Sequence, residues 1–385
     1  MNTLADRLED KPVEIEQEVT SLELFFDLVF VFAITQVTSM LSSDPTWGGA
    51  GRALLVLGAL WWAWTGYAWL TNAVNPDEGA VRLAILGAMG AMLVVALAVP
   101  NAFGSDGVLF GVAYFSVRLL HIVLFALAAR GDREMLGSVL RLGVGSTIGP
   151  GLIIVAGFTD GGAQAALWTI ALALDYLGGA FSSGGWRVSP RHFAERHGLI
   201  IIIALGESIV AIGVGARASA LDTGEIAAAL LGIAVVTALW WTYFDVVALV
   251  AERKLSELNG VAQASLARDT YSYLHLPMVA GIVLFALALK QSLGHLGDEL
   301  DTVPAVALCG GPAMYLLAHD AMRFRTSRTY NGRRLLTVAA LVALIPAALS
   351  VPALAALAAV TTVCWALVAW EALRYPDTRH QIRHA

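Results

Sequence analysis

Twelve long apolar segments constrain the fold of this chain more than any other feature. A helix needs about 20 mainly apolar residues to cross the roughly 30 Å of hydrocarbon in a bilayer. Such segments lie at about 22–42, 52–74, 81–101, 107–129, 135–157, 163–184, 191–216, 225–250, 267–290, 303–322, 334–350 and 352–373. Hydrophobic residues make up 58% of the chain and charged residues only 14%, which excludes a soluble globular domain and a disordered chain. The prediction is an all-α polytopic membrane protein with about twelve transmembrane helices.

Basic residues predict which side of the membrane each connecting loop occupies. Cytoplasmic loops carry an excess of lysine and arginine. With the N-terminus inside, the outer segments hold only Arg52, Arg217 and Lys290, and the inner segments hold most of the others. One missed or extra helix would move every later loop to the wrong side, so this lopsided division supports the count. We therefore expect a multi-pass protein whose N-terminus and C-terminus are both cytoplasmic.

The second half of the sequence repeats features of the first half in the same order. Three pairs of segments carry the repeat: Leu60-Trp61-Trp62 with Leu239-Trp240-Trp241, Arg118–His121 with Tyr315–His319, and Trp168–Asp175 with Trp365–Glu371. Six helices per half return the chain to its starting side, so the halves would be parallel copies around an axis along the membrane normal. The predicted organisation is a cytoplasmic segment (1–21), two six-helix repeats (22–184 and 185–373) and a cytoplasmic tail (374–385).

Ionisable residues within the apolar segments are the candidates for a functional site. A charge at the centre of a spanning helix costs about 2.5 to 3.5 kcal/mol on insertion scales, so it normally faces a protein interior or a water-filled path. Asp27 and Glu207 lie in the first and seventh segments, and we predict that they frame a central polar site between the repeats. The candidate substrate or ion pathway consists of Asp27, Arg118, His121, Asp175, Glu207 and Ser208.

Each of these residues also has a structural interpretation. Asp27 can lock helices together, while Glu23 with Thr20 is typical of a capping box that opens the first helix. Arg118 needs a carboxylate partner, which Asp27, Asp175 or Glu207 could supply, and a closed interhelical salt bridge is the alternative to a pathway. We predict Arg118 as the counter-ion of the central site.

Tryptophan clusters offer a second kind of site. Trp61, Trp62, Trp240 and Trp241 lie within their segments and could line a site that stacks on an organic cation or a sugar. The alternative is an aromatic belt at the membrane interface.

Other function classes lack support in the sequence. No Walker loop, GxSxG or HExxH motif occurs, so no catalytic residue and no cofactor is predicted. Cys309 and Cys364 form no metal-ligand spacing, so no metal site is predicted. The net charge of −6 without a basic stripe argues against nucleic acid as a partner. Membrane lipid and a small solute or ion are the expected partners, and a homodimer is left open.

Two long motifs resemble a known family. SLELFFDLVFVFAITQVT at 21–38 and HFAERHGLIIIIALGESIVAIG at 192–213 are similar to the bacterial low temperature requirement A (LtrA) family. The resemblance implies an integral membrane protein over most of the chain, in the cytoplasmic (inner) membrane of a bacterium. That family has no settled molecular activity, so the resemblance adds little about mechanism.

A shorter run is similar to a second family. FFDLVF at 25–30 resembles the FSD stretch that opens the first helix of a potassium-channel family of lysosomes and bacteria. The resemblance implies six-helix units whose first helix lines a pore, with Asp27 at the motif aspartate. Phe26 stands where that motif has serine, and Glu23 stands where a basic residue is expected.

The function predicted from the sequence is translocation of a small solute or ion through the central polar site. A cation channel is one alternative. A membrane enzyme or a scaffold without transport activity is the other, because Glu207, Ser208 and histidines could converge in the folded chain.

Overall fold

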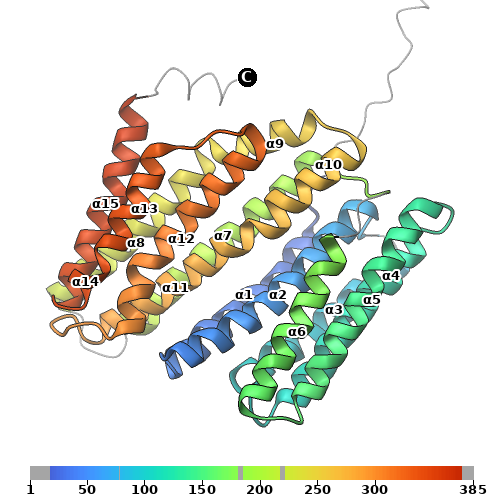
Figure 1. Cartoon of the computed structure of the whole chain (residues 1–385), viewed down its shortest axis with the longest axis horizontal. Helices are drawn as coiled ribbons and strands as arrows, with labels where there is room; N and C mark the ends of the chain where they lie inside the picture. Colours follow the sequence, from blue (N-terminus) through green and yellow to red (C-terminus); the bar gives the residue numbers. More distant parts are fainter. Residues whose placement is uncertain (1–17, 78, 181–184, 217–221, 375–385) are drawn as a thin grey trace, which may run out of the picture.

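The computed structural model describes residues 18–77, 79–180, 185–216 and 222–374 (Figure 1). Within these ranges the chain forms helices and no β-sheet. The all-α class predicted from the sequence is confirmed. Most of the predicted segment 1–21 and most of the predicted tail 374–385 lie outside the described residues.

The first half contains six long helices. These are α1 (Ser21–Ser43), α2 (Trp47–Ala73), α3 (Gly79–Ala98) with the 3-10 turn η2 (Val99–Asn101), α4 (Gly107–Ala128), α5 (Arg133–Ala156) and α6 (Gly161–Ala180). The predicted capping box opens α1, since Glu23 donates its backbone N–H to the Thr20 hydroxyl and Thr20 donates its N–H to the Glu23 carboxylate. Local sequence therefore fixes where the first helix begins.

The second half is more broken. It contains α7 (Pro190–Gly215), α8 (Thr223–Phe244), α9 (Val247–Ser256), α10 (Gly260–Ala267), the π-helix η4 (Arg268–Tyr273), α11 (His275–Leu293), α12 (Thr302–Ser327), α13 (Gly332–Ala343), α14 (Ile345–Ala348) and α15 (Ala353–Arg374). Helices α8 and α9 form one run, as do α10, η4 and α11. The predicted segment 334–350 is divided into α13 and α14, and Pro346 lies in the first turn of α14, where a missing N–H is tolerated.

Ten helical runs in the described residues are long and apolar enough to cross a membrane. They match ten of the twelve predicted segments. Helix α6 and the α13–α14 pair are helical in the structure, but neither is both long and apolar enough to be among these ten runs. Large apolar side chains such as Leu83, Phe158 and Leu373 are more than two-thirds exposed, as expected for a lipid-facing surface. The chain is therefore a multi-pass membrane protein.

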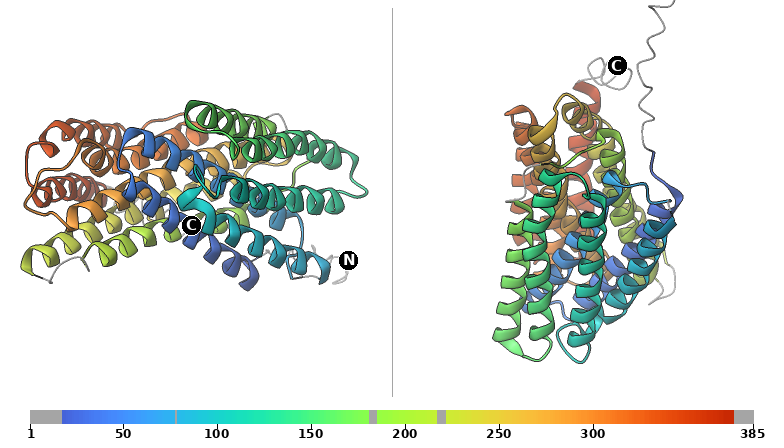
Figure 2. Two further views of the ribbon diagram at one scale, coloured as in Figure 1. Left: turned by 90° about the horizontal axis from the view of Figure 1, so that it is seen from below. Right: turned by 90° about the vertical axis from the view of Figure 1, so that its right-hand side faces the viewer.

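The two halves pack their helices in a similar order. In the first half α1 packs against α2 and α3, α3 against α4, α4 against α5, and α5 against α6. In the second half α7 packs against α8 and α11, α11 against α12, α12 against α13, and α13 against α15. Figure 2 shows the helices of both halves running side by side along one common direction.

The halves meet where α1 and α2 contact α7 and α11 (Figure 1). Close helix packing supports this central region. A Cβ atom added to Gly281 of α11 would lie 2.5 Å from the Gly311 carbonyl oxygen of α12, so only glycine permits that approach. Helix α11 thereby packs closely on α12, and it also packs against α7.

Candidate functional site

A buried cluster of ionisable side chains joins the first helix of each half. It consists of Glu23 and Asp27 on α1 and His192 and Arg196 on α7, and we call it the α1–α7 cluster. Arg196 Nη2 donates to Asp27 Oδ1 at 3.0 Å, and Arg196 Nη1 lies 3.6 Å from Glu23 Oε1. His192 Nε2 lies 3.1 Å from the same Glu23 oxygen. All four side chains are at most 1% exposed.

The spacing of the sequence explains this geometry. Glu23 and Asp27 are four residues apart on α1, and His192 and Arg196 are four residues apart on α7. Residues at that spacing share one face of a helix. Two acids on one face of α1 therefore meet two basic side chains on one face of α7. The capping bond from Thr20 also fixes the Glu23 carboxylate at the first turn.

Hydrogen bonds assign the protonation state of His192. Asn72 Oδ1 accepts a bond from the Ser189 backbone N–H at 2.7 Å, so its amide nitrogen faces His192 Nδ1, 3.0 Å away. That amide can only donate, so Nδ1 accepts and the proton lies on Nε2, which donates to Glu23. His192 is therefore neutral. Two carboxylates in the cluster face one guanidinium.

Trp64 of α2 closes the cluster on a third side. Its indole Nε1 donates to Asp27 Oδ1 at 2.9 Å, and the Arg196 guanidinium lies 5.7 Å from the ring centroid. Asp27 Oδ2 is buried and has no hydrogen-bond partner among the described residues. One oxygen of the central carboxylate is thus free to accept a further donor or cation.

Glu207 lies on the same α1–α7 interface but outside the cluster. It is eleven residues beyond Arg196 along α7, which corresponds to about 16 Å of helix. The Thr35 hydroxyl of α1 donates to Glu207 Oε2 at 2.6 Å, and Glu207 is 3% exposed. The adjacent Ser208 hydroxyl is buried without a hydrogen-bond partner among the described residues. The interface therefore carries a second buried carboxylate, that of Glu207. Its hydrogen-bond partner among the described residues is the uncharged Thr35 hydroxyl.

Arg118 belongs to a different cluster, inside the first half. Its Nη2 donates to Asp175 at 2.8 Å and to Ser146 at 2.6 Å, and its Nη1 donates to the Trp62 carbonyl at 3.4 Å. His121 Nδ1 lies 3.4 Å from the same Nη1. The prediction that Arg118 is the counter-ion of the central site is wrong, because Arg118 pairs with Asp175 and the counter-ion of Asp27 is Arg196.

The four tryptophans of the predicted aromatic lining do not meet in one place. Trp61 donates its indole N–H to the Ser272 carbonyl at 2.7 Å. Trp62 stacks on Tyr176 and lines a pocket. Trp240 is 41% exposed on the outside of α8, and Trp241 is half-buried beside it. Only Trp62 thus contributes to a cavity described below.

Sequence reasoning missed His192 and Arg196 as site residues. Arg196 fits the excess of basic residues that the loop-charge rule expects on the inner side, and the capping box accounts for Glu23. The signal that could have found them was the matched four-residue spacing of acids and bases at the starts of two corresponding helices. Among the described residues no group of three or more metal-ligating side chains comes together.

Comparisons with known proteins place the chain in a family. A family model described as bacterial low temperature requirement A protein (LtrA) matches residues 18–369. An uncharacterized protein of Rhizobium meliloti (strain 1021) is 32% identical over 370 residues, which cover 91% of this chain and 90% of that relative. No solved structure matches. The chain therefore belongs to the bacterial low temperature requirement A (LtrA) family.

Proposed function

We propose that this LtrA-family protein carries a small solute or ion across the bacterial cytoplasmic membrane, through the polar interface between α1 and α7. Both termini would be cytoplasmic, as the distribution of basic residues indicates. The interface is where the two halves meet, and helical carriers built from repeats bind their substrates and coupling ions between such halves.

The observation that carries the proposal is the charge imbalance of the α1–α7 cluster. Glu23 and Asp27 face the single guanidinium of Arg196, since His192 is neutral by its hydrogen bonds. An uncompensated charge buried in a membrane protein is costly. A proton or a small cation would balance it, and the unpartnered Asp27 Oδ2 is the atom that would bind it.

Two equivalent arginine clusters support a duplicated architecture. Arg334 of α13 donates to Glu371 of α15 at 2.9 Å, lies 2.8 Å from His319 Nδ1, and donates to the Thr242 carbonyl of α8 at 3.1 Å. Arg118 likewise contacts Asp175 of α6, the last helix of its half. It also contacts His121 of the fourth helix, α4, and the Trp62 carbonyl of the second helix, α2. The shared packing order of the halves points the same way.

The burial of the two carboxylates favours a carrier over a channel. An open pore would leave Asp27 and Glu207 in contact with water, whereas they are 1% and 3% exposed. Such sealing fits the closed state of a protein whose halves move relative to each other. Carrier-type transport predicts saturable flux, and channel conduction predicts flux that follows voltage without saturation.

The experiment is flux into liposomes that contain the purified protein. Proton uptake is followed with an enclosed pH-sensitive dye, and rubidium uptake with a tracer. Saturable flux is expected, and Asp27→Asn or Glu207→Gln should lower it about tenfold or more, equivalent to about 1.4 kcal/mol in the barrier. Glu225→Gln is the matched control, because Glu225 is also buried but lies in the first turn of α8, away from the α1–α7 interface residues Asp27 and Glu207.

The outcomes separate the three classes of function. Flux that survives both substitutions in folded protein would rule out these two carboxylates as pathway residues. Unsaturable, voltage-following flux would favour the channel alternative. Absence of proton, rubidium and solute flux would favour a membrane enzyme or scaffold and would reject the transport proposal.

A further inference from the structure

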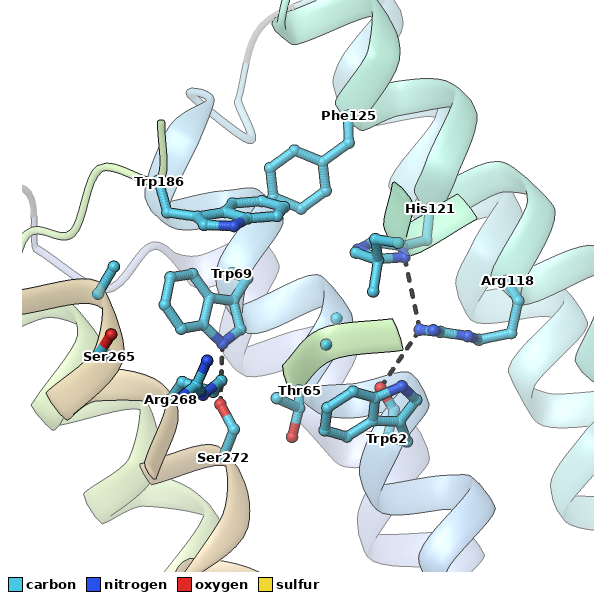
Figure 3. A pocket seen from close by; sticks show the side chains of 14 residues that line it. Trp62, Thr65, Trp69, Arg118, His121, Phe125, Trp186, Ser265, Arg268 and Ser272 are labelled. Atoms are coloured by element: carbon cyan, nitrogen blue, oxygen red, sulfur yellow. Dashed lines mark hydrogen bonds between the residues drawn. The ribbon is translucent and has the colours of Figure 1, made fainter. Parts of the chain in front are cut away.

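A pocket lies beside the Arg118 cluster, between the first half and the α10–η4 segment. It is lined by Trp62, Thr65 and Trp69 of α2, Arg118 and His121 of α4, and Arg268 of η4, among others (Figure 3). Its volume is about 60 Å³. A water molecule needs roughly 10 to 15 Å³ of such space, so the pocket has room for about four to six water-sized groups.

Several polar atoms of the residues that line the pocket lack partners. The Trp62 indole Nε1, the Thr65 hydroxyl and the Arg118 Nε are buried and make no hydrogen bond within the described residues. Trp62, Thr65 and Arg118 are 6%, 2% and 1% exposed. An indole N–H and a guanidinium N–H can only donate. Buried donors without acceptors are costly, so this wall is suited to a ligand that presents oxygen acceptors.

The charges around the pocket select the sign of the ligand. Two arginines, Arg118 and Arg268, contribute to the lining among the described residues, and no carboxylate does. The positive charge of Arg118 is balanced by Asp175, whose Oδ1 lies 2.8 Å from Arg118 Nη2. At the rim, Arg268 shares the single carboxylate of Asp269 with Arg325, which leaves an excess of one positive charge there. The rim therefore favours an anion.

The remaining walls are apolar and aromatic. Trp69 packs edge-on against Trp186, and Trp186 packs edge-on against Phe125. Trp69 also donates its indole N–H to the Ser272 hydroxyl at 2.9 Å. Ser272 lies in the π-helix η4, a rare form of backbone that often occurs at functional sites. These walls would accommodate a short hydrocarbon body next to the polar end of the pocket.

From these contacts we propose that this pocket binds a short-chain organic carboxylate of about four to six heavy atoms. Its carboxylate accepts hydrogen bonds from Trp62, Thr65 and Arg118, and its apolar end lies against Trp69 and Phe125. Binding at this pocket is separate from the α1–α7 interface and does not require transport. It can therefore be measured without a gradient across a membrane.

The test is ligand-observed NMR or calorimetry on the purified full chain, with butyrate as the probe. Butyrate should bind saturably, its neutral isostere butyramide about fivefold more weakly, and butylamine not at all. Thr65→Val and Trp62→Phe should each weaken butyrate binding about threefold to tenfold. The control is Thr361→Val, since Thr361 is also a buried threonine but lies on α15, outside the pocket.

The opposite results would overturn the proposal. They are the absence of saturable butyrate binding, equal binding of butylamine, or an affinity that neither pocket substitution changes. Thr65→Val preserves side-chain shape, so it keeps the test decisive if the Trp62 variant fails to fold. Loss of butyrate binding with intact ion flux would reject this pocket alone, and intact binding without flux would reject only the transport proposal.

Discussion

Replacing Arg196 by methionine tests whether the α1–α7 cluster holds the two halves together. The substitution keeps an unbranched side chain but leaves Glu23 and Asp27, both 1% exposed, without their guanidinium. Breaking a buried ion pair from one side costs about 3 to 5 kcal/mol. Among its hydrogen-bond partners in the described residues, Asp27 would then keep the Trp64 indole, at 2.9 Å. We therefore expect a loss of about 3 kcal/mol or more in the free energy of unfolding.

The assay is equilibrium unfolding in mixed detergent micelles, followed by circular dichroism. Asp27→Asn alone should cost less, about 1 to 3 kcal/mol, because Arg196 keeps Glu23 at 3.6 Å. The double variant should be less destabilised than the sum of the two by roughly 0.5 to 3 kcal/mol. The control is Arg187→Met, whose side chain is 83% exposed and should change stability by about 0.5 kcal/mol or less. The coupling between Arg196 and Asp27 would be refuted if the stability losses of the two single variants simply added in the double variant. It would also be refuted if Arg196→Met lost no more stability than Arg187→Met.

Two further predictions concern single positions. A Cβ atom at Gly66 would lie 2.8 Å from Arg118 Nη1. Gly66→Ala should therefore displace the guanidinium and lower the free energy of unfolding by about 1 to 3 kcal/mol. Gly87→Ala is the control in the same unfolding assay, because a Cβ atom at Gly87 meets open space. In the loop after α1, the hydrogen bond from the Thr46 hydroxyl holds the pKa of Asp44 below its ordinary value of 3.8. That contribution to stability is complete above the ordinary pKa and is lost as the pH falls through the lowered pKa; a stability difference between wild type and Asp44→Asn that does not shrink on acidification would contradict it.

Much of the architecture could be predicted from the sequence because bilayer thickness imposes one length on every spanning helix. The exceptions have local causes. Helix α6 contains Gln164 and Asp175, which lower its mean hydropathy although it packs in the same way as its neighbours. The segment 334–350 is interrupted near Pro346. Hydropathy measures what a helix contains, and not which of its faces is covered by other helices.

The burial of several candidate residues was predictable from the sequence, but their pairing was not, and His192 and Arg196 were missed. Insertion cost singles out Asp27, Arg118 and Glu207 as buried charges, and all three are buried. Which arginine meets which carboxylate depends on the order in which helices pack, which no spacing within one segment reveals. Arg196 was hidden because its position near the start of α7 also fits an arginine whose side chain reaches the membrane surface.

The two arginine clusters show why a sequence comparison of the halves detects only part of a site. His121 and His319 lie on the fourth helices of the two halves, and Asp175 and Glu371 lie on the last helices. The arginines do not correspond, because Arg118 lies on the fourth helix of its half and Arg334 on the fifth. A long, flexible side chain can deliver a guanidinium to the same histidine and acid from either neighbouring helix. The chemistry of the cluster is therefore repeated in space even though the position of its arginine is not repeated along the chain.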